Sequence, residues 1–130
     1  MNEELNYALK KFKDATAKLE EGVQKAEGEL ERDGVIQRFE FSFELFWKTV
    51  KIFLKDKGIN ATTPKETLRE AFRLEWIVDE NQVLNMLEDR NKTTHIYDKA
   101  TAQEIFDRIR NAYLGIMKDL VEKLETFLGD

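Results

Sequence analysis

Apolar residues recur near the start of the chain at spacings that place them on one face of a helix. Steps of three, four and seven residues keep side chains on the same side when a helix turns every ~3.6 residues. The stripe consists of Leu5, Leu9, Phe12, Leu19, Val23, Ala26 and Leu30. This pattern predicts a first long helix that ends near Arg32.

A second helix is predicted from Asp33, which can cap its start, to about Lys57, where Gly58 provides a C-terminal signal. The segment FEFSFEL inside it alternates apolar and polar residues, which alone is typical of a strand. The wider window has helical spacing and no turn residue, and this favours the helix. Its apolar stripe consists of Ile36, Phe39, Phe43, Phe46, Val50 and Phe53.

The same predicted helix carries apolar residues on its opposite side as well. Phe41, Leu45 and Ile52 fall there, away from the main stripe. A small bundle has one core and cannot bury both faces of a helix within a single chain. These three residues are therefore predicted to line the interface of a homodimer.

Two shorter helices are predicted from their start signals. TPKE at 63–66 combines a capping Thr, a Pro at the first helical position and a Glu three residues after the cap, which predicts a helix through about Leu74. DENQ at 79–82 repeats this arrangement, so Asp79 is predicted to cap a helix that fades around Asn91.

The last predicted helix begins between Asp98 and Thr101, where TAQE can also form a capping box. Its apolar stripe consists of Ile105, Ile109, Ala112, Ile116, Leu120, Leu124 and Leu128. Together these elements predict an all-α fold, an antiparallel up-and-down four-helix bundle with one additional short helix. A length of 130 residues suits one core, so residues 1–130 are predicted to form a single domain.

Composition narrows the class of protein. Hydrophobic residues make up 42% and charged residues 36%, with one proline, which excludes a disordered or collagen-like chain. The absence of cysteine excludes disulfides, thiolate zinc sites and a cysteine nucleophile. The charged N-terminal segment and the lack of a long apolar run predict a cytoplasmic protein that makes no use of a membrane. A net charge of −5 argues against binding of nucleic acid through bulk charge.

The segment EDRNKTTHIYDKA at 88–100 holds the only histidine, with an arginine five residues before it and a tyrosine two residues after it. Arg90 continues the stripe of Val83 and Leu87, so it needs an internal partner, and a salt bridge with a carboxylate such as Glu44 is one interpretation. His95, taken alone, suits a capping or hydrogen-bonding role in a polar loop.

The combination of these residues also suits a second interpretation, cleavage of RNA by its own 2′-hydroxyl. That reaction needs a base with a pKa near neutrality and a cation beside the developing phosphorane charge, which histidine and arginine supply. Glu88, Asp89 and Asp98 can in principle hold Mg²⁺, but one histidine without cysteine or an HExxH motif is weak evidence for a metal. We predict neither a metal nor another cofactor.

The spacing within this segment resembles a known signature. RNKTTHIY is similar to the R-x4-H-x-Y motif of the HEPN superfamily, in the branch encoded beside minimal nucleotidyltransferases and described as nucleotidyltransferase substrate-binding subunits. Three long blocks resemble this branch in the same order: IQRFEFSFELFWKTVK, TPKETLREAF and MLEDRNKTTHIYDKATAQEIF. One departure is Val83, where relatives often carry tryptophan.

The resemblance implies a dimeric helical bundle and a metal-independent ribonuclease that acts as a toxin, with a minimal nucleotidyltransferase partner as its antitoxin. Arg90 and His95 match the ribonuclease pair, and Asn91 matches the polar residue that follows the arginine. Tyr97 matches the tyrosine that the partner adenylylates in some members; without the resemblance, it suits an amphipathic residue with a packed ring and a wet hydroxyl.

Two further expectations concern charge and the alternative function. Lys92 and Lys99, with the same residues of the second chain in a dimer, can supply a local positive patch for RNA on an otherwise acidic chain.

The alternative function belongs to another class. It is a non-catalytic subunit that binds a substrate for a nucleotidyltransferase or anchors the nucleotidyltransferase. In that case the same residues bind nucleotide or shape the interface.

Overall fold

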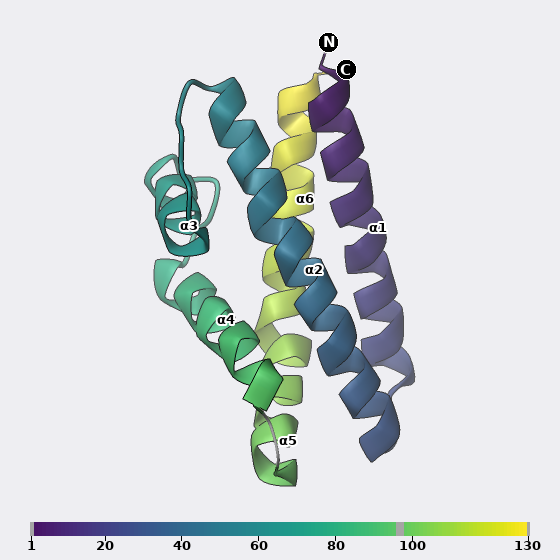
Figure 1. Ribbon diagram of the computed structural model, residues 1–130. Helices are drawn as coiled ribbons and strands as arrows, with labels where there is room; N and C mark the ends of the chain where they lie inside the picture. Colours follow the sequence, from purple (N-terminus) through teal and green to yellow (C-terminus); the bar gives the residue numbers. More distant parts are fainter. Residues whose placement is uncertain (1, 96–97, 130) are drawn as a thin grey trace.

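In a computed structural model that describes residues 2–95 and 98–129, all regular structure of the described residues is helical. Four main helices and one short helix form the bundle in Figure 1, which confirms the predicted fold class. The elements are α1 (Glu3–Lys25), α2 (Glu29–Asp56), the short α3 (Pro64–Arg73), α4 (Glu80–Lys92), the 3₁₀ turn η1 (Thr93–His95), and a last helix made of α5 (Lys99–Arg108), the π-helical turn η2 (Ile109–Tyr113) and α6 (Leu114–Leu128).

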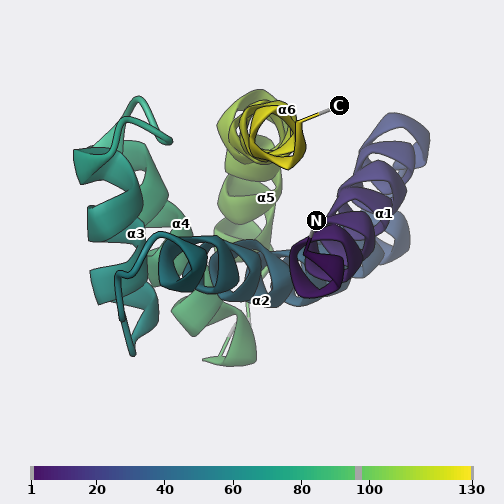
Figure 2. The same ribbon diagram turned by 90° about the horizontal axis from the view of Figure 1, so that it is seen from above.

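Helix α2 is the centre of the bundle. Viewed from above, it lies between α1 on one side and α3 and α4 on the other, and it also contacts the last helix (Figure 2). The core against which it packs is rich in aromatic rings, and Phe39 stacks on Tyr113 of η2 with ring centroids 5.6 Å apart. The largest fully buried side chains include Phe12, Phe39, Phe43, Phe46, Phe53 and Tyr113. Burial of this apolar area is the main favourable contribution to the fold.

The predicted boundary between the first two helices is wrong. Helix α1 ends at Lys25, and α2 begins at Glu29 with Gly28 as its cap. The Gly28 N–H donates to Oε1 of Glu31 at 2.7 Å, which satisfies one of the amides that a helix start leaves open. Leu30 extends the apolar stripe in the sequence but is 80% exposed on α2. The prediction used apolar periodicity alone and therefore extended the first helix past Lys25, where the chain leaves the helix before the capped start of α2.

The other predicted boundaries are confirmed within one or two residues. Gly58 has a φ of +83° directly after α2, a conformation that favours glycine. Thr63, Asp79 and Asp98 each accept a hydrogen bond from the backbone N–H three residues later, at 2.7 to 3.1 Å. The last helix is capped by Asp98, so the capping box considered at Thr101 does not form.

The second apolar face of α2 is incompletely covered by the chain itself. Phe41 is 61% exposed, whereas Leu45 and Ile52 are partly buried. The face that carries Phe41 is therefore available at the surface of α2.

None of the helices in the described part of the chain is long and apolar enough to cross a membrane.

Candidate functional site

The site lies at the end of the bundle opposite the two chain termini, where α4 ends and α5 begins (Figure 1). Arg90 is in the last turn of α4, and its Nη2 lies 2.9 Å from Oε1 of Glu44 on α2. The arginine and glutamate side chains are 28% and 34% exposed. The salt bridge with Glu44 that the sequence suggested is therefore present, and it holds the guanidinium against α2.

Threonine side chains shape the end of α4. Oγ1 of Thr93 donates to the carbonyl of Arg90 at 2.6 Å, and Oγ1 of Thr94 donates to the carbonyl of Asn91 at 3.3 Å. The Arg90 carbonyl also accepts a hydrogen bond from the backbone N–H of Thr93, so the side-chain bonds reinforce the tighter turn η1. His95 closes η1 and is exposed.

A surface groove of about 540 Å³ runs beside His95. The residues that line it come from the end of α4, η1 and the start of α5: Glu88, Asn91, Lys92, His95, Asp98 and Thr101. The structure thus brings His95, Asn91 and Lys92 together. Arg90 is outside this lining and faces α2, so the predicted arginine and histidine do not share one groove within the chain.

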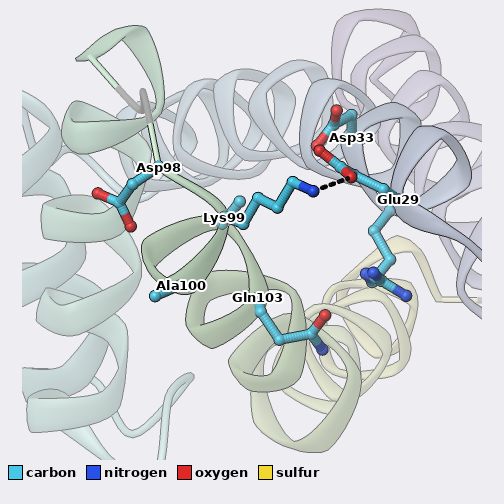
Figure 3. A pocket seen from close by; sticks show the side chains of 8 residues that line it. Glu29, Asp33, Asp98, Lys99, Ala100 and Gln103 are labelled. Carbon is cyan, nitrogen blue, oxygen red and sulfur yellow. Dashed lines mark ion pairs between the residues drawn. The ribbon is translucent and has the colours of Figure 1, made fainter.

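The second predicted lysine lies in a neighbouring notch of about 330 Å³ between the starts of α2 and α5. Figure 3 shows Lys99 reaching across this notch to Glu29, and its Nζ lies 3.2 Å from Oε2 of the glutamate. Both side chains are mostly exposed. Exposed pairs of this kind contribute little to stability, so Glu29 holds Lys99 only weakly. Tyr97 is outside the described residues.

Sequence reasoning missed a buried charged cluster one residue before Arg90. Asp89 is only 3% exposed and accepts hydrogen bonds from Nε and Nη2 of Arg108 at 2.7 and 2.9 Å. The hydroxyl of Tyr113 donates to the same carboxylate at 2.5 Å. A sequence signal existed, because Asp89 follows the buried Val83 and Met86 at steps of three. Asp89 was considered only as a Mg²⁺ ligand, and among the described residues no three metal-binding side chains of this type come together.

The cluster shifts the pKa of both partners of Asp89. The hydrogen bond to the carboxylate raises the pKa of Arg108 above its ordinary range. Burial raises the pKa of Tyr113, and the hydrogen bond to Asp89 raises it further. Both side chains therefore keep their protons, and each continues to donate to Asp89 at neutral pH.

Replacing Tyr113 with phenylalanine tests this cluster through its pH dependence. We expect the free energy of unfolding at neutral pH to fall by about 1–3 kcal/mol, because a buried carboxylate loses one donor. The native pKa of Tyr113 is raised, so the hydroxyl's contribution is complete below the unfolded pKa of ~10 and declines as the pH rises above it. Urea unfolding of both proteins should show a difference that narrows above about pH 10. A constant difference would contradict the assignment.

Comparison with known proteins shows a family to which the chain is similar over most of its length. A family model described as nucleotidyltransferase substrate binding protein like matches residues 7–126. A curated relative from Haemophilus influenzae, described as probable ribonuclease HepT, is 37% identical over 81 residues. That alignment covers 58% of this chain, and the chain spans 56% of the relative's length.

Two solved structures are similar over nearly their whole length. A crystal structure of a Thermus thermophilus protein has a TM-score of 0.82 at 32% identity, covering 87% of this chain and 98% of that one. A Haemophilus influenzae structure has a TM-score of 0.69 at 27% identity, covering 93% of this chain and 96% of that one. The second is described as revealing the fold of a substrate-binding domain of a nucleotidyltransferase.

Proposed function

Because the chain belongs to the nucleotidyltransferase substrate-binding-like family, we propose that it is a HEPN-type toxin, a metal-independent endoribonuclease that a minimal nucleotidyltransferase neutralises. The similarity to a protein described as a probable ribonuclease supports this proposal. The observation that carries it is the groove at the end of α4, where His95, Asn91 and Lys92 meet. Arg90 directly precedes Asn91 but lies outside the lining of the groove, where Glu44 holds its guanidinium.

The proposed chemistry uses the 2′-hydroxyl of the RNA as the nucleophile. His95 acts as general base or acid, because an exposed imidazole at neutral pH can take the proton of the 2′-oxygen or protonate the departing 5′-oxygen. Arg90 stabilises the charge that develops on the phosphorane oxygens. Asn91 supports the phosphate as a neutral donor. The reaction gives a 2′,3′-cyclic phosphate and a free 5′-hydroxyl.

The proposed site is a composite of two chains. An in-line displacement benefits from an acid and a base on opposite sides of the phosphate, and each chain has a single histidine. The surface of α2 that carries Phe41 lies on the helix that holds Arg90 through Glu44. Pairing of two chains across Phe41, Leu45 and Ile52 would bury this apolar face and bring the two α4 ends toward a common cleft.

Local charge supports contact with RNA in spite of the acidic chain. Lys92 lines the groove, and Lys99 is held by Glu29 only through an exposed ion pair. Two chains would contribute four such lysines around one cleft. Their contacts with phosphate release counterions, so RNA binding should weaken as the salt concentration rises.

A non-catalytic role is the second candidate. The family description and the Haemophilus structure favour a subunit that binds a substrate for a nucleotidyltransferase. In this role the groove at His95 would hold a nucleotide without cleaving it, and Arg90 would shape the surface for the partner.

Incubation of the pure protein with RNA separates these candidates. We expect cleavage of total RNA and of single-stranded oligomers in the presence of EDTA, with products that end in a 2′,3′-cyclic phosphate. An oligomer with one 2′-deoxy sugar at the preferred position should resist cleavage there, because its nucleophile is missing. Binding of RNA or nucleotide without any cleavage would favour the non-catalytic role.

Adenylylation of Tyr97 by the partner is expected to abolish cleavage. The phenol oxygen attacks the α-phosphorus of ATP, pyrophosphate leaves, and the tyrosine then carries a phosphodiester charge two residues from His95. We expect this charge to repel the RNA backbone and the bulk of the adenylate to hinder the approach of RNA. Mass spectrometry after co-expression with a neighbouring nucleotidyltransferase should detect one adenylate per modified chain, and none on Tyr97→Phe. Suppressed cleavage by an active partner that leaves Tyr97 unmodified would show inhibition by complex formation.

A further inference from the structure

Two consecutive residues in the last turn of α4 bind side chains of two different helices. Asp89 binds Arg108 and Tyr113 of the last helix, and Arg90 binds Glu44 of α2. The carbonyl of Arg90 then accepts from Thr93, at the start of the turn that ends in His95. The buried carboxylate of Asp89 thus joins the last turn of α4, which carries Arg90, to the middle of the last helix.

The π-helical turn η2 explains how two residues of the last helix reach one carboxylate. Arg108 and Tyr113 are five positions apart, and in a regular α-helix at ~100° per residue they would point about 140° away from each other. In η2 the amide of Leu114 donates to the carbonyl of Ile109, five residues earlier. This wider turn brings residues five apart onto the same side of the helix. The insertion therefore directs both donors at Asp89.

The geometry of the cluster leaves Asp89 little freedom. Oδ2 accepts from Nε of Arg108 and from Tyr113, and Oδ1 accepts from Nη2 of Arg108. A two-pronged contact between a guanidinium and a carboxylate fixes their relative orientation as well as their distance. Tyr113 is fully buried and stacks on Phe39 of α2, so the cluster is joined to the core. Because both oxygens of Asp89 are held, the turn of α4 that carries Asp89 is held in position relative to the last helix.

We propose that Asp89 is a positioning residue, which with Arg108, Tyr113 and the π-helical turn fixes the end of α4 and thereby the placement of Arg90 and His95. The role in catalysis rests on the proposed ribonuclease function, but the placement itself does not. Asp89 is buried and both of its carboxylate oxygens are occupied by Arg108 and Tyr113, so we infer that it acts through its neighbours. Active sites depend on such supporting contacts, because a shift of about 1 Å in a reacting group can lower a rate about 100-fold.

The placement can be tested without RNA, because the chain has one histidine and therefore one imidazole signal. In NMR spectra of the full chain, Asp89→Asn should shift or broaden the signals of the His95 ring and of the Arg90 side chain. Leu5→Ala serves as the control: Leu5 is 5% exposed and belongs to the first turn of α1. Figure 1 shows the N-terminus, from which α1 starts, at the end of the bundle opposite the end of α4. This control weakens the fold without touching the cluster.

The kinetic readout separates positioning from general destabilisation. Asp89→Asn should lower kcat for RNA cleavage by about 10- to 100-fold at a temperature where the variant is fully folded, with KM nearly unchanged. Leu5→Ala should keep kcat. If Asp89→Asn does not fold, Tyr113→Phe keeps the ring in the core, removes one donor, and should change the same signals to a smaller degree.

Three outcomes decide the proposal. Changed His95 and Arg90 signals in the cluster variants but not in Leu5→Ala support it. Unchanged signals in a folded cluster variant, or equal changes in Leu5→Ala, overturn it. Absence of cleavage by the unmodified protein contradicts the ribonuclease function, and the NMR comparison still decides whether Asp89 places the histidine.

Discussion

Replacement of His95 with alanine is expected to lower the rate of RNA cleavage by about 100- to 10,000-fold, the range of a lost general acid or base. Folding should be preserved, because the side chain is exposed and such substitutions usually change stability by no more than about 0.5 kcal/mol. The comparison is made by following cleavage of a labelled oligomer, with thermal unfolding recorded on the same samples.

Gln24→Ala is a suitable control for the histidine variant, because it also changes an exposed polar residue on a helix but lies outside the groove. It should cleave RNA at the original rate. Arg90→Ala is a less direct test, since removal of the guanidinium takes one of the two cationic partners from the partly buried Glu44, which keeps only Lys48, and this change can lower stability as well as activity. Equal rates of RNA cleavage by the unmodified protein and by His95→Ala would show that the imidazole takes no part in the reaction.

Replacement of Phe41 with aspartate should convert a dimer into monomers and abolish cleavage with it. Phe41 is 61% exposed on α2, so the change costs the monomer little, whereas two carboxylates facing each other across a two-fold interface repel and lose apolar contact. Light scattering at micromolar concentration reports the mass, and the cleavage assay on the same sample reports the activity.

Val78→Asp is the matched control for this variant, because Val78 is an apolar residue that is 94% exposed outside α2. It should leave both the mass and the activity unchanged. A monomeric original protein that cleaves RNA would contradict the composite site, and so would a monomeric Phe41→Asp variant with full activity.

Much of the fold could be predicted from the sequence because capping chemistry is local. Thr63, Asp79 and Asp98 were identifiable as helix starts, and each accepts the expected backbone hydrogen bond. The break between α1 and α2 was missed because Leu30 continues the apolar period, whereas the decisive contact is between Gly28 and Glu31. The spacing of apolar residues indicates which side of a helix a residue occupies, but it does not indicate where the helix ends.

The site was predictable only in part. Spacing placed Arg90 on an apolar stripe and so indicated a partly buried salt bridge with a carboxylate such as Glu44, which the structure contains. The partners of Asp89 did not follow, because Arg108 and Tyr113 share a side of the last helix only through the π-helical turn. An inserted turn of this kind changes the phase of a helix without any signal from glycine or proline in the segment IRNAY.

The most direct test of the composite site is cleavage by mixed dimers. Unmodified and His95→Ala chains are co-refolded in varied proportions at constant total concentration, and the rate is measured against the fraction of unmodified chains. If both histidines serve one site, only dimers of two unmodified chains are active, and an equal mixture should retain about one quarter of the rate. A linear dependence, with about half of the rate retained in the equal mixture, would contradict the account, because each chain would then cleave RNA with its own histidine.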